Sequence, residues 1–570
     1  MIISLVKRYS GNADWSWLLF VITGAVIFGS ASFNSSAQAA ETIIFRYGFL
    51  ERSLAVNDLE TFVETGAVSA ELGAYLRLLP LARRQQLRSA LQERLRLSPV
   101  AVAQLLYSPL GKELLNQAAT IIQTQARQSN TYALRAALIT AAADPEGLTA
   151  LSLIRHYPSG SIRVDLQKGL TILKNFQATI RETETILDVV RRQSVVDEWQ
   201  QNVPSVQSLL YPGGGRWLEM PWSVEDRSPR RLQLTGHPRT IEVDVYLPLV
   251  AAQQLVPVVV ISHGLGANRH SYRYLSQHLA SHGFAVLALE HAGSSTRQLL
   301  SFPVGYTSAY AAAQEFLDRP LDVTFVLNHL SEFPEQLHPW QGRLNLEGVA
   351  MIGQSFGGYT ALALAGARLD FEQLARHCPS NILNSFNVSL LLQCQAQMLP
   401  PRTYDFQDRR IKAVLAVNPI TSALFSPRSL AQLTIPVMFV AGSNDTIAPA
   451  VSEQIYPFTW LTTRDRYLAL IDDATHFSTI GEARDNEPVM PVPARLVGAT
   501  PPLSRAYLKA LSLAFLRAHL LEDETARQWL TPAAASALSI PPHSLSLTHS
   551  LATPMLDTAL DQLAVTRRDR

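Results

Sequence analysis

The stretch from Val349 to Gly358, Val-Ala-Met-Ile-Gly-Gln-Ser-Phe-Gly-Gly, contains the pattern Gly-x-Ser-x-Gly. Four apolar residues with strand character precede the pattern, and a helical run from Tyr359 to Ala367 follows it. A strand that turns this sharply into a helix leaves no room for side chains two residues before and after the serine, and glycine supplies that room. The serine hydroxyl then stands above the sheet at the positive end of the helix. We therefore predict that Ser355 is a nucleophile.

A nucleophilic serine needs a histidine base and a carboxylate that orients it, in the chain order serine, acid, histidine. The apolar run Ile435–Gly442 reads as a buried parallel strand, and Asp445 lies in the loop after it. A second run, Tyr467–Ile471, is followed closely by His476. Both residues would lie at the carboxyl edge of a sheet, where such sheets place their chemistry. The sequence thus predicts a triad of Ser355, Asp445 and His476.

The third requirement is a pair of N–H donors for the oxygen that becomes negative during the reaction. One donor is expected on Phe356, directly after the nucleophile. The other is expected in the loop after the strand Val256–Ser262, which reads His-Gly-Leu-Gly. We predict that Leu265 supplies it and that His263 braces the loop through hydrogen bonds.

Three motifs together carry a family resemblance. They are His-Gly-Leu-Gly-Ala at 263–267, Leu-Ala-Ser-His-Gly-Phe-Ala-Val-Leu-Ala-Leu-Glu-His at 279–291, and Gly-Gln-Ser-Phe-Gly-Gly at 353–358. This combination resembles the plasma-type platelet-activating-factor acetylhydrolases, over about residues 240 to 480. The resemblance implies the α/β-hydrolase fold and cleavage of short or oxidised acyl chains from glycerophospholipids. The expected acyl-enzyme chemistry uses no metal or cofactor.

One position departs from that family. The family takes its acid from just after the strand that follows the nucleophile helix, and here that position holds Asn418. Asp445, one strand later, is where most α/β hydrolases keep the acid. Asp472 and Asp473 are rival acids, although adjacent carboxylates beside a polar turn are more often solvated. Bacterial esterases similar to dienelactone hydrolase share much of the pattern, so an ester that is not a lipid stays an alternative substrate.

The elements that must position these residues alternate between strand and helix from Ile241 onward. Such alternation predicts a mostly parallel sheet with helices on both faces. We assign residues 205–525 to this α/β domain, after a passage rich in proline and glycine. An insertion at about 368–410 follows the nucleophile helix and is expected to form a lid. It holds both cysteines, Cys378 and Cys394, either as a disulfide or as two buried thiols.

The remaining segments flank this domain. Residues 41–200 read as a helical N-terminal domain, similar to one of unassigned activity found ahead of bacterial α/β hydrolases. Five arginines between 83 and 96 mark a solvated helix face or a contact with anionic lipid. Residues 526–570 are rich in proline, serine and alanine, and we expect a flexible tail.

Residues 1–39 read as an export signal. Lys7 and Arg8 precede an apolar stretch of 15 residues, Trp15–Gly29, and Ala37-Gln38-Ala39 fits a cleavage site. A membrane span needs about 20 residues, and extending the stretch to Phe33 keeps an uncleaved anchor as the alternative.

Composition excludes several classes of function. The chain has 570 residues, 47% of them hydrophobic and 17% charged, with a net charge of +1. It therefore exceeds one ordinary domain and lacks the basic surplus of a nucleic-acid-binding protein. Zinc-type and phosphate-loop spacings are absent from the sequence. Two classes remain, an exported serine esterase and a catalytically idle lipid-binding scaffold with the same fold, and the oligomeric state stays open.

Overall fold

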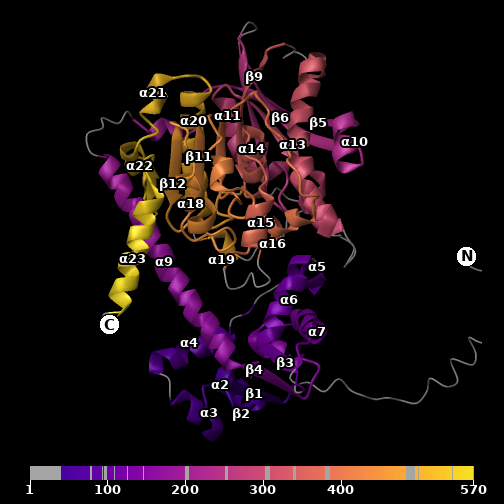
Figure 1. The fold of residues 1–570 in the computed structure, drawn as a ribbon, viewed down its shortest axis with the longest axis vertical. Coiled ribbons are helices and arrows are strands. Elements are labelled where there is room, and N and C mark those ends of the chain that lie inside the picture. Colours follow the sequence, from indigo (N-terminus) through magenta and orange to yellow (C-terminus); the bar gives the residue numbers. More distant parts are fainter. Residues whose placement is uncertain are drawn as a thin grey trace, which may run out of the picture.

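The computed structural model describes residues 40–568, except 78–79, 93, 95–98, 108, 125, 127, 146, 199–204, 251–253, 302–308, 338–341, 379–385, 483–493, 499 and 542. The leader and the cleavage site predicted within residues 1–39 lie outside the described residues. Two lobes share one long helix, with the large sheet in the upper lobe of Figure 1 and a smaller sheet in the lower lobe. No described helix has the length and apolar character needed to cross a membrane.

The large sheet has nine strands in the order β13-β12-β11-β10-β9-β7-β8-β6-β5. Neighbouring strands from β12 to β8 run parallel, while β13, β6 and β5 pair antiparallel with their neighbours at the two edges. The mixed, mostly parallel sheet of the α/β-hydrolase fold is therefore confirmed. Its strands are β5 (Trp217–Asp226), β6 (Arg239–Pro248), β7 (Val256–Ser262), β8 (Ala285–Glu290), β9 (Leu344–Gln354), β10 (Ile411–Val417), β11 (Val437–Gly442), β12 (Arg466–Ile471) and β13 (Leu545–Thr548).

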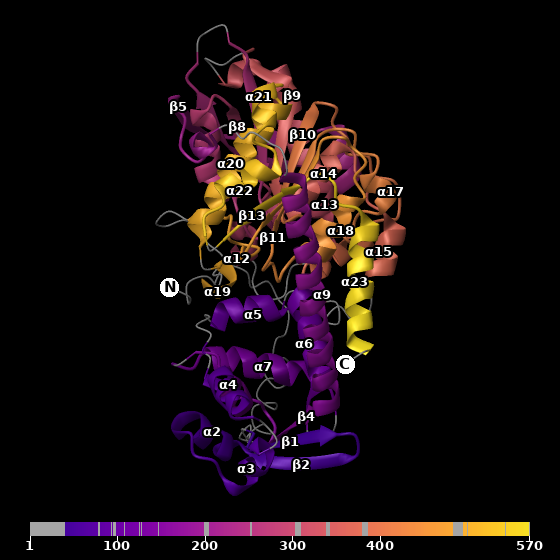
Figure 2. The ribbon, with the colours of Figure 1, turned by 90° about the vertical axis from the view of Figure 1, so that its left-hand side faces the viewer.

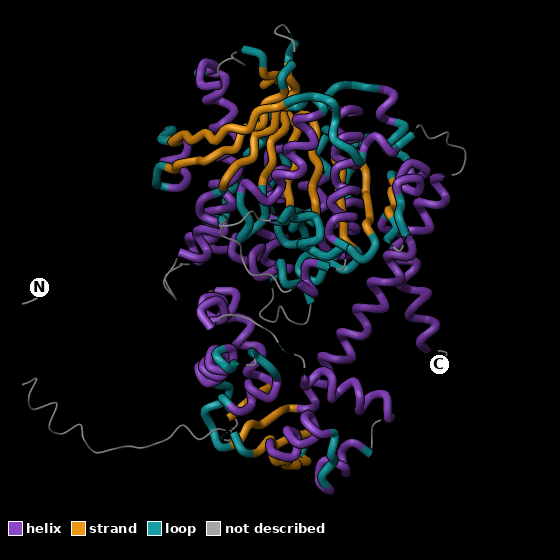
Figure 3. Tube along the Cα trace, turned by 180° about the vertical axis from the view of Figure 1, so that it is seen from behind, coloured by secondary structure: helices purple, strands orange, loops and turns teal. Residues whose placement is uncertain are grey.

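Helices cover both faces of this sheet, as Figure 3 shows. Val258 and Val260 of β7 point into one apolar cluster, and Val259 and Ile261 point into the other, because successive strand residues face opposite sides. The first face carries α13 and α14, and the second carries α11 and α20. The helices of this lobe are α10 (Pro229–Thr235), α11 (Arg273–Ser281), α12 (Thr296–Ser301), α13 (Ala309–Glu332), α14 (Phe356–Ala365), α15 (Phe371–His377), α16 (Leu390–Gln393), α17 (Pro427–Leu430), α18 (Tyr456–Thr459), α19 (Ala494–Val497), α20 (Pro501–His519), α21 (Glu524–Arg527), α22 (Pro532–Leu538) and α23 (Thr553–Arg568).

The N-terminal lobe is not made of helices alone, which corrects the prediction. A four-stranded sheet in the order β2-β1-β4-β3 supports its helices. Strands β1 and β2 form a hairpin, and β1 pairs in parallel with β4, more than a hundred residues later in the chain. Local periodicity carries no trace of such a distant pairing. The elements are β1 (Thr42–Tyr47), β2 (Leu50–Ala55), β3 (Ile122–Thr124), β4 (Ser161–Asp165), α2 (Val56–Thr65), α3 (Ala70–Leu76), α4 (Leu81–Gln92), α5 (Pro99–Tyr107), α6 (Pro109–Ile121), α7 (Thr131–Ala142) and α8 (Ala150–Arg155).

The long helix α9 (Leu166–Glu198) joins the two lobes (Figure 2). Its last turns belong to the core of the large lobe, where Ile186, Leu187 and Val190 are fully buried against the sheet. Arg191 on the same helix donates to Asp472, directly after β12. The domain boundary predicted near residue 200 is therefore wrong, because part of the hydrolase core comes from the segment before it.

The predicted flexible tail is also wrong. Strand β13 adds to the edge of the sheet beside β12, and α22 and α23 pack around α9. Leu547, Leu551 and Leu556 are fully buried. Burial of a few leucines in a segment rich in serine and proline is a tertiary effect, which composition does not reveal.

The N-terminal lobe lies on the side of the sheet to which the carboxyl ends of the parallel strands point. In Figure 1, α5 and α6 lie beneath α15, α16 and α19, and α6 contacts α16. The edge of the sheet that should hold the chemistry thus faces the smaller lobe.

Candidate active site

Ser355 occupies the turn between β9 and α14. Its backbone has φ 55° and ψ −113°, a strained conformation for any residue with a Cβ atom. The turn is held by the backbone N–H of Ser355, which donates to the carbonyl oxygen of Val417 at 2.9 Å. The strain and this tie to β10 are those of a nucleophile elbow.

The glycines of the motif are required sterically, as predicted. A Cβ atom on Gly353 would lie 2.0 Å from the carbonyl oxygen of Gly357. A Cβ atom on Gly357 would lie 2.0 Å from the carbonyl oxygen of Ser262, at the end of β7. Both neighbours are backbone atoms, which cannot move aside without breaking the turn. Any larger residue at either position would displace Ser355.

The structure brings Asp445 and His476 together at the carboxyl edge of the sheet. Asp445 follows β11, His476 follows β12, and the carboxylate Oδ2 accepts from the imidazole Nδ1–H at 2.7 Å. Both side chains are buried. The other carboxylate oxygen accepts from the backbone N–H groups of Ile447 and Ala448, each at 2.8 Å. Asp445 is thus fixed by its own loop and in turn fixes the imidazole tautomer that carries its proton on Nδ1.

The described contacts of His476 Nε2 lead to Gln354 rather than to Ser355. The amide Nε2 of Gln354 lies 3.3 Å from His476 Nε2 and 3.3 Å from the His476 carbonyl oxygen. No hydrogen bond joins Ser355 to His476 within the described part of the chain. Hydrogen bonds of catalytic groups often tighten only when substrate is bound, so this arrangement is compatible with His476 as the base of Ser355. The sequence offered no signal for the contact, since Gln354 fills an unrestricted position of the motif.

The rival acids have other partners. Asp472 accepts from Arg191 at 2.7 Å, and Asp473 accepts from Asn444 at 3.2 Å. Asn418, at the position where the resembling family places its acid, donates to the Thr475 carbonyl oxygen at 3.3 Å. None of the three contacts the imidazole of His476 within the described residues. The geometry therefore favours Asp445.

The loop after β7 lies against the nucleophile. A Cβ atom on Gly264 would lie 2.2 Å from Gln354 Oε1 and 3.3 Å from the Cβ atom of Ser355, so a larger residue here would push Gln354 aside and crowd the nucleophile. Leu265, the next residue, and Phe356, after the serine, carry the two predicted N–H donors. Neither N–H has a hydrogen-bond partner among the described residues, which leaves both free for a substrate oxygen.

His263 braces this loop, as predicted. Its Nδ1–H donates to the carbonyl oxygen of Gly264 at 2.7 Å, and its Nε2 accepts from the backbone N–H of His291 at 3.0 Å. Burial, reinforced by the nearby Arg319 cation, lowers the pKa of His263 well below its usual value. The imidazole is therefore neutral, with its single proton on the nitrogen that faces the loop.

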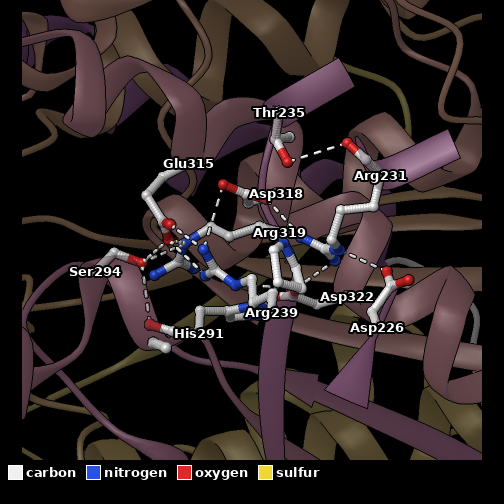
Figure 4. A network of polar contacts seen from close by, with 12 residues as sticks. Asp226, Arg231, Thr235, Arg239, His291, Ser294, Glu315, Asp318, Arg319 and Asp322 are labelled. Carbon is white, nitrogen blue, oxygen red and sulfur yellow. Dashed lines mark hydrogen bonds and ion pairs between the residues drawn. The ribbon is translucent and has the colours of Figure 1, made fainter. Parts of the chain in front are cut away.

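A buried charged cluster beneath the loop was missed by sequence reasoning (Figure 4). Arg319 is its member closest to the site, with Nη1 donating to the carbonyl oxygen of His263 at 2.7 Å. The guanidinium carbon of Arg319 also lies 4.3 Å from the centre of the Phe356 ring. A signal did exist, because Glu315, Asp318, Arg319 and Asp322 recur at i, i+3, i+4 and i+7 on the otherwise apolar helix α13. That spacing puts all four on one buried face.

Two further arginines balance the acids of this cluster. Arg231 is fully buried and contacts Asp226, Asp318 and Asp322, while Arg239 contacts Glu315 at 2.6 Å. Burial raises the pKa of Asp318 to about 6 despite Arg239 nearby. For Glu315 burial acts in the same direction, but Arg239 outweighs it and the pKa is lowered.

The predicted lid insertion is firmly attached. Cys378 and Cys394 form a disulfide, with their Cα atoms 5.6 Å apart. The buried carboxylate of Glu453, in the π-helical turn Val451–Ile455, accepts from the Gln393 amide at 2.9 Å and from the Thr421 backbone N–H at 2.6 Å. One carboxylate thus joins the insertion to the loop after β10.

Comparisons with known proteins agree with this architecture. Residues 39–165 match a family described as an alpha/beta hydrolase of unknown function (DUF1400). Residues 239–302 match the family of platelet-activating factor acetylhydrolase, isoform II. A platelet-activating factor acetylhydrolase of Cavia porcellus is 29% identical over 134 residues, which cover 19% of this chain and 31% of that protein.

The second match contains the loop that carries Leu265, and it ends before the nucleophile elbow. The chain spans about a third of the length of the acetylhydrolase it matches. The fold, the site geometry and these matches agree: the chain has the α/β-hydrolase fold and, over part of its length, resembles the platelet-activating factor acetylhydrolases.

Proposed function

We propose that this protein is an exported serine hydrolase of carboxylic esters, acting on a lipid or short-acyl phospholipid ester. The observation that carries the proposal is the convergence of three separate segments at one sheet edge. The strained Ser355, the bonded pair Asp445–His476 and the loop of Leu265 all meet there. Each supplies one part that acyl transfer through a serine requires.

In the proposed reaction His476 Nε2 removes the proton from Ser355 Oγ as that oxygen attacks the ester carbonyl. This step requires the Gln354 amide to give up its contact with Nε2. The N–H groups of Leu265 and Phe356 stabilise the negative oxygen, and Asp445 stabilises the imidazolium. His476 then gives its proton to the leaving alcohol, and water attacks the acyl-enzyme by the same route.

The lipid substrate is inferred from the resemblance to a platelet-activating factor acetylhydrolase. The geometry of the site supports only the reaction class, which is acyl transfer through a serine. The choice of a lipid substrate depends on a short matched segment. An ester that is not a lipid, as in enzymes similar to dienelactone hydrolase, is the competing substrate class.

Export is proposed from the leader in residues 1–39. The disulfide between Cys378 and Cys394 supports it, because such bonds persist in oxidising compartments. Sequencing of the protein recovered from the extracytoplasmic fraction should find a new N-terminus at Ala40. An intact N-terminus in the membrane fraction would instead indicate an uncleaved anchor.

A fluorophosphonate probe tests the reaction class, because it labels only an activated serine. The wild type should be labelled on Ser355, and Ser355→Ala should lose labelling and about 10⁴-fold in ester hydrolysis. Ser512→Ala is the matched control: its buried hydroxyl has no hydrogen-bond partner among the described residues, and it lies on α20, which packs on the opposite face of the sheet from α14. Absence of labelling in the wild type would indicate an idle scaffold.

A panel of p-nitrophenyl esters of increasing chain length, tested beside short-acyl phospholipids, then separates the substrate classes. Preference for the phospholipids supports the lipid assignment. Hydrolysis restricted to small water-soluble esters would favour the other class.

A further inference from the structure

We propose that Arg319 is a positioning residue that sets the direction of the oxyanion-binding N–H groups in the reaction proposed above. It touches no substrate atom in this scheme. It acts through the backbone of the loop after β7 and through the ring of Phe356.

Hydrogen bonds to a carbonyl oxygen fix the orientation of the peptide between Gly264 and Leu265. The carbonyl of Gly264 and the N–H of Leu265 belong to this one planar unit, so they point in opposite directions. The carbonyl oxygen accepts from His263 Nδ1–H at 2.7 Å, and Arg319 Nη2 approaches it at 3.5 Å. Because the oxygen is held toward the protein interior, the N–H must point outward.

Arg319 also contacts the His263 carbonyl and the ring of Phe356, the residue that carries the other N–H donor. Arg319 Nη1 donates to the carbonyl oxygen of His263 at 2.7 Å, which fixes the start of the loop. The same guanidinium lies 4.3 Å from the Phe356 ring centre, within the range of cation–π attraction. One planar cation therefore contacts both segments that carry an oxyanion donor.

The positive charge of Arg319 also affects how strongly the N–H group of Leu265 can donate. A cation beside a carbonyl oxygen polarises that peptide, so the Arg319 guanidinium, 3.5 Å from the Gly264 oxygen, makes the Leu265 N–H a better donor. Its 2.7 Å bond to the His263 oxygen acts on the Gly264 N–H and fixes the start of the loop. Burial lowers the pKa of Arg319 to about 9, partly offset by Glu315, so the guanidinium stays charged at neutral pH. Ser294 Oγ accepts from Arg319 Nε at 2.9 Å and donates to Glu315, which holds the cation in place.

Arg319 differs in this respect from the other arginines of the cluster. The described contacts of the Arg231 guanidinium are all with carboxylates, and none of them is with the loop of residues 263–266. Both arginines are fully buried, and both balance acids of α13. Arg231→Lys therefore replaces a buried guanidinium of the same cluster and leaves every described contact of the loop of residues 263–266 in place. This makes it a matched control.

The experiment compares Arg319→Lys, Arg319→Gln and Arg231→Lys in the full chain. Fluorophosphonate titration measures the concentration of active sites. Each kcat is divided by that concentration, so that a loss of folded protein is not mistaken for a loss of rate. For the Arg319 variants we expect kcat on a p-nitrophenyl ester to fall about 10- to 100-fold with KM nearly unchanged, since removal of a donor outright costs about 10²–10³. Their affinity for a trifluoromethyl ketone, which forms a tetrahedral oxyanion on the serine, should fall by a similar factor.

For Arg231→Lys we expect a lower melting temperature with kcat per titrated site within about 3-fold of the wild type. Equal losses of kcat and ketone affinity in Arg231→Lys and Arg319→Lys would overturn the proposal, since the effect would then belong to the cluster as a whole. Unchanged kcat in the Arg319 variants would also overturn it. A wild type that neither labels nor hydrolyses esters would refute the proposed function instead, which keeps the two failures distinct.

If the Arg319 variants do not fold, Ser294→Ala replaces them. It removes one bond from the guanidinium while the cation keeps its other partners. We expect a loss of about 3-fold in kcat with a matching loss in ketone affinity, and no change in either would overturn the proposal.

Discussion

Gln354 lies between the nucleophile and the base, with its amide 3.3 Å from His476 Nε2. This side chain is buried and bonds the backbone of the base as well as its ring. It therefore holds the loop of His476 in place while it occupies the nitrogen that must accept the proton of Ser355.

Gln354→Glu should raise the pH below which esterase activity is lost. A carboxylate at this distance from the imidazole favours the protonated ring, which cannot act as a base. The measurement is the pH profile of kcat/KM, with Gln354→Met as the control of similar length and no charge. Equal profiles for both variants would contradict the contact.

The acid of the triad is tested by Asp445→Asn. The amide would permit the wrong imidazole tautomer, and we expect a loss of about 10⁴-fold in kcat. Asn418→Ala and Asp473→Asn should cost far less, because neither residue contacts the imidazole in the described structure. If Asp473 proved essential instead, the orienting carboxylate would come from the loop after β12 and not from the loop after β11.

At the scale of residues, the sequence predicted those candidates for catalysis that directly follow apolar strands, and the fold brings them close together. Ser355, Asp445 and His476 could be found because each occupies a loop at the end of a recognisable strand. Arg319 and Gln354 could not be assigned in this way. Their roles depend on contacts between α13, β9 and loops far apart in the chain, and no local pattern encodes those contacts.

At the scale of elements, the lid insertion is held by the disulfide within it and by hydrogen bonds to the loops after β10 and β11. The disulfide joins α15 to the turn after α16, and Glu453 binds Gln393 beside Cys394. The second attachment does not depend on the disulfide.

Replacing both cysteines by serine should lower the free energy of unfolding by up to about 3 kcal/mol. Amide hydrogen exchange should rise in α15, whose link is lost, more than around Gln393, which Glu453 still holds. Glu453→Gln with the disulfide intact should show the reverse. Two freely alkylated thiols in the non-reduced protein would contradict the bond itself.

Helix α20 ends at His519, whose Nε2 bonds the Tyr467 hydroxyl of β12 at 2.8 Å. Burial lowers the pKa of His519 to about 4, against about 6.5 in an unfolded chain. In this window the unfolded chain binds the additional proton, so stability is complete above about pH 6.5 and falls as the pH drops toward 4.

We expect His519→Gln to lose less stability than the wild type between pH 7.5 and pH 5, by on the order of 1–2 kcal/mol. Urea unfolding at the two pH values measures the difference. A wild-type stability independent of pH would contradict the buried, neutral imidazole.

Elements were predictable where their pattern is local. The alternation of strands and helices after Ile241 predicted the large sheet, and the elbow appears where expected. The parallel pairing of β1 with β4 and the edge strand β13 were missed, because each is defined by a partner far away in the sequence.

At the scale of the whole molecule, α9 makes the two lobes interdependent. Its residues Ile186, Leu187 and Val190 are core residues of the hydrolase lobe, although they precede the predicted boundary. Arg191 adds an ion pair to Asp472, four residues before His476.

A chain that begins at residue 166 should therefore keep a cooperative unfolding transition and label on Ser355. A chain that begins at residue 205 should lose both, because a buried face of the sheet would be uncovered. Calorimetry and fluorophosphonate labelling of the two truncated chains measure this. Equal behaviour of the two would show that α9 adds nothing to the core.

The shared helix also constrains when the protein can fold during synthesis. Leu547 of β13 donates its backbone N–H to Ser194 of α9 at 3.1 Å, so a helix made early contacts a strand made among the last residues. The sheet between them cannot be closed on that side until β13 has left the ribosome. Domains usually fold as units during synthesis, the earliest first. This lobe must instead wait with one helix uncovered while the strands between α9 and β13 are made.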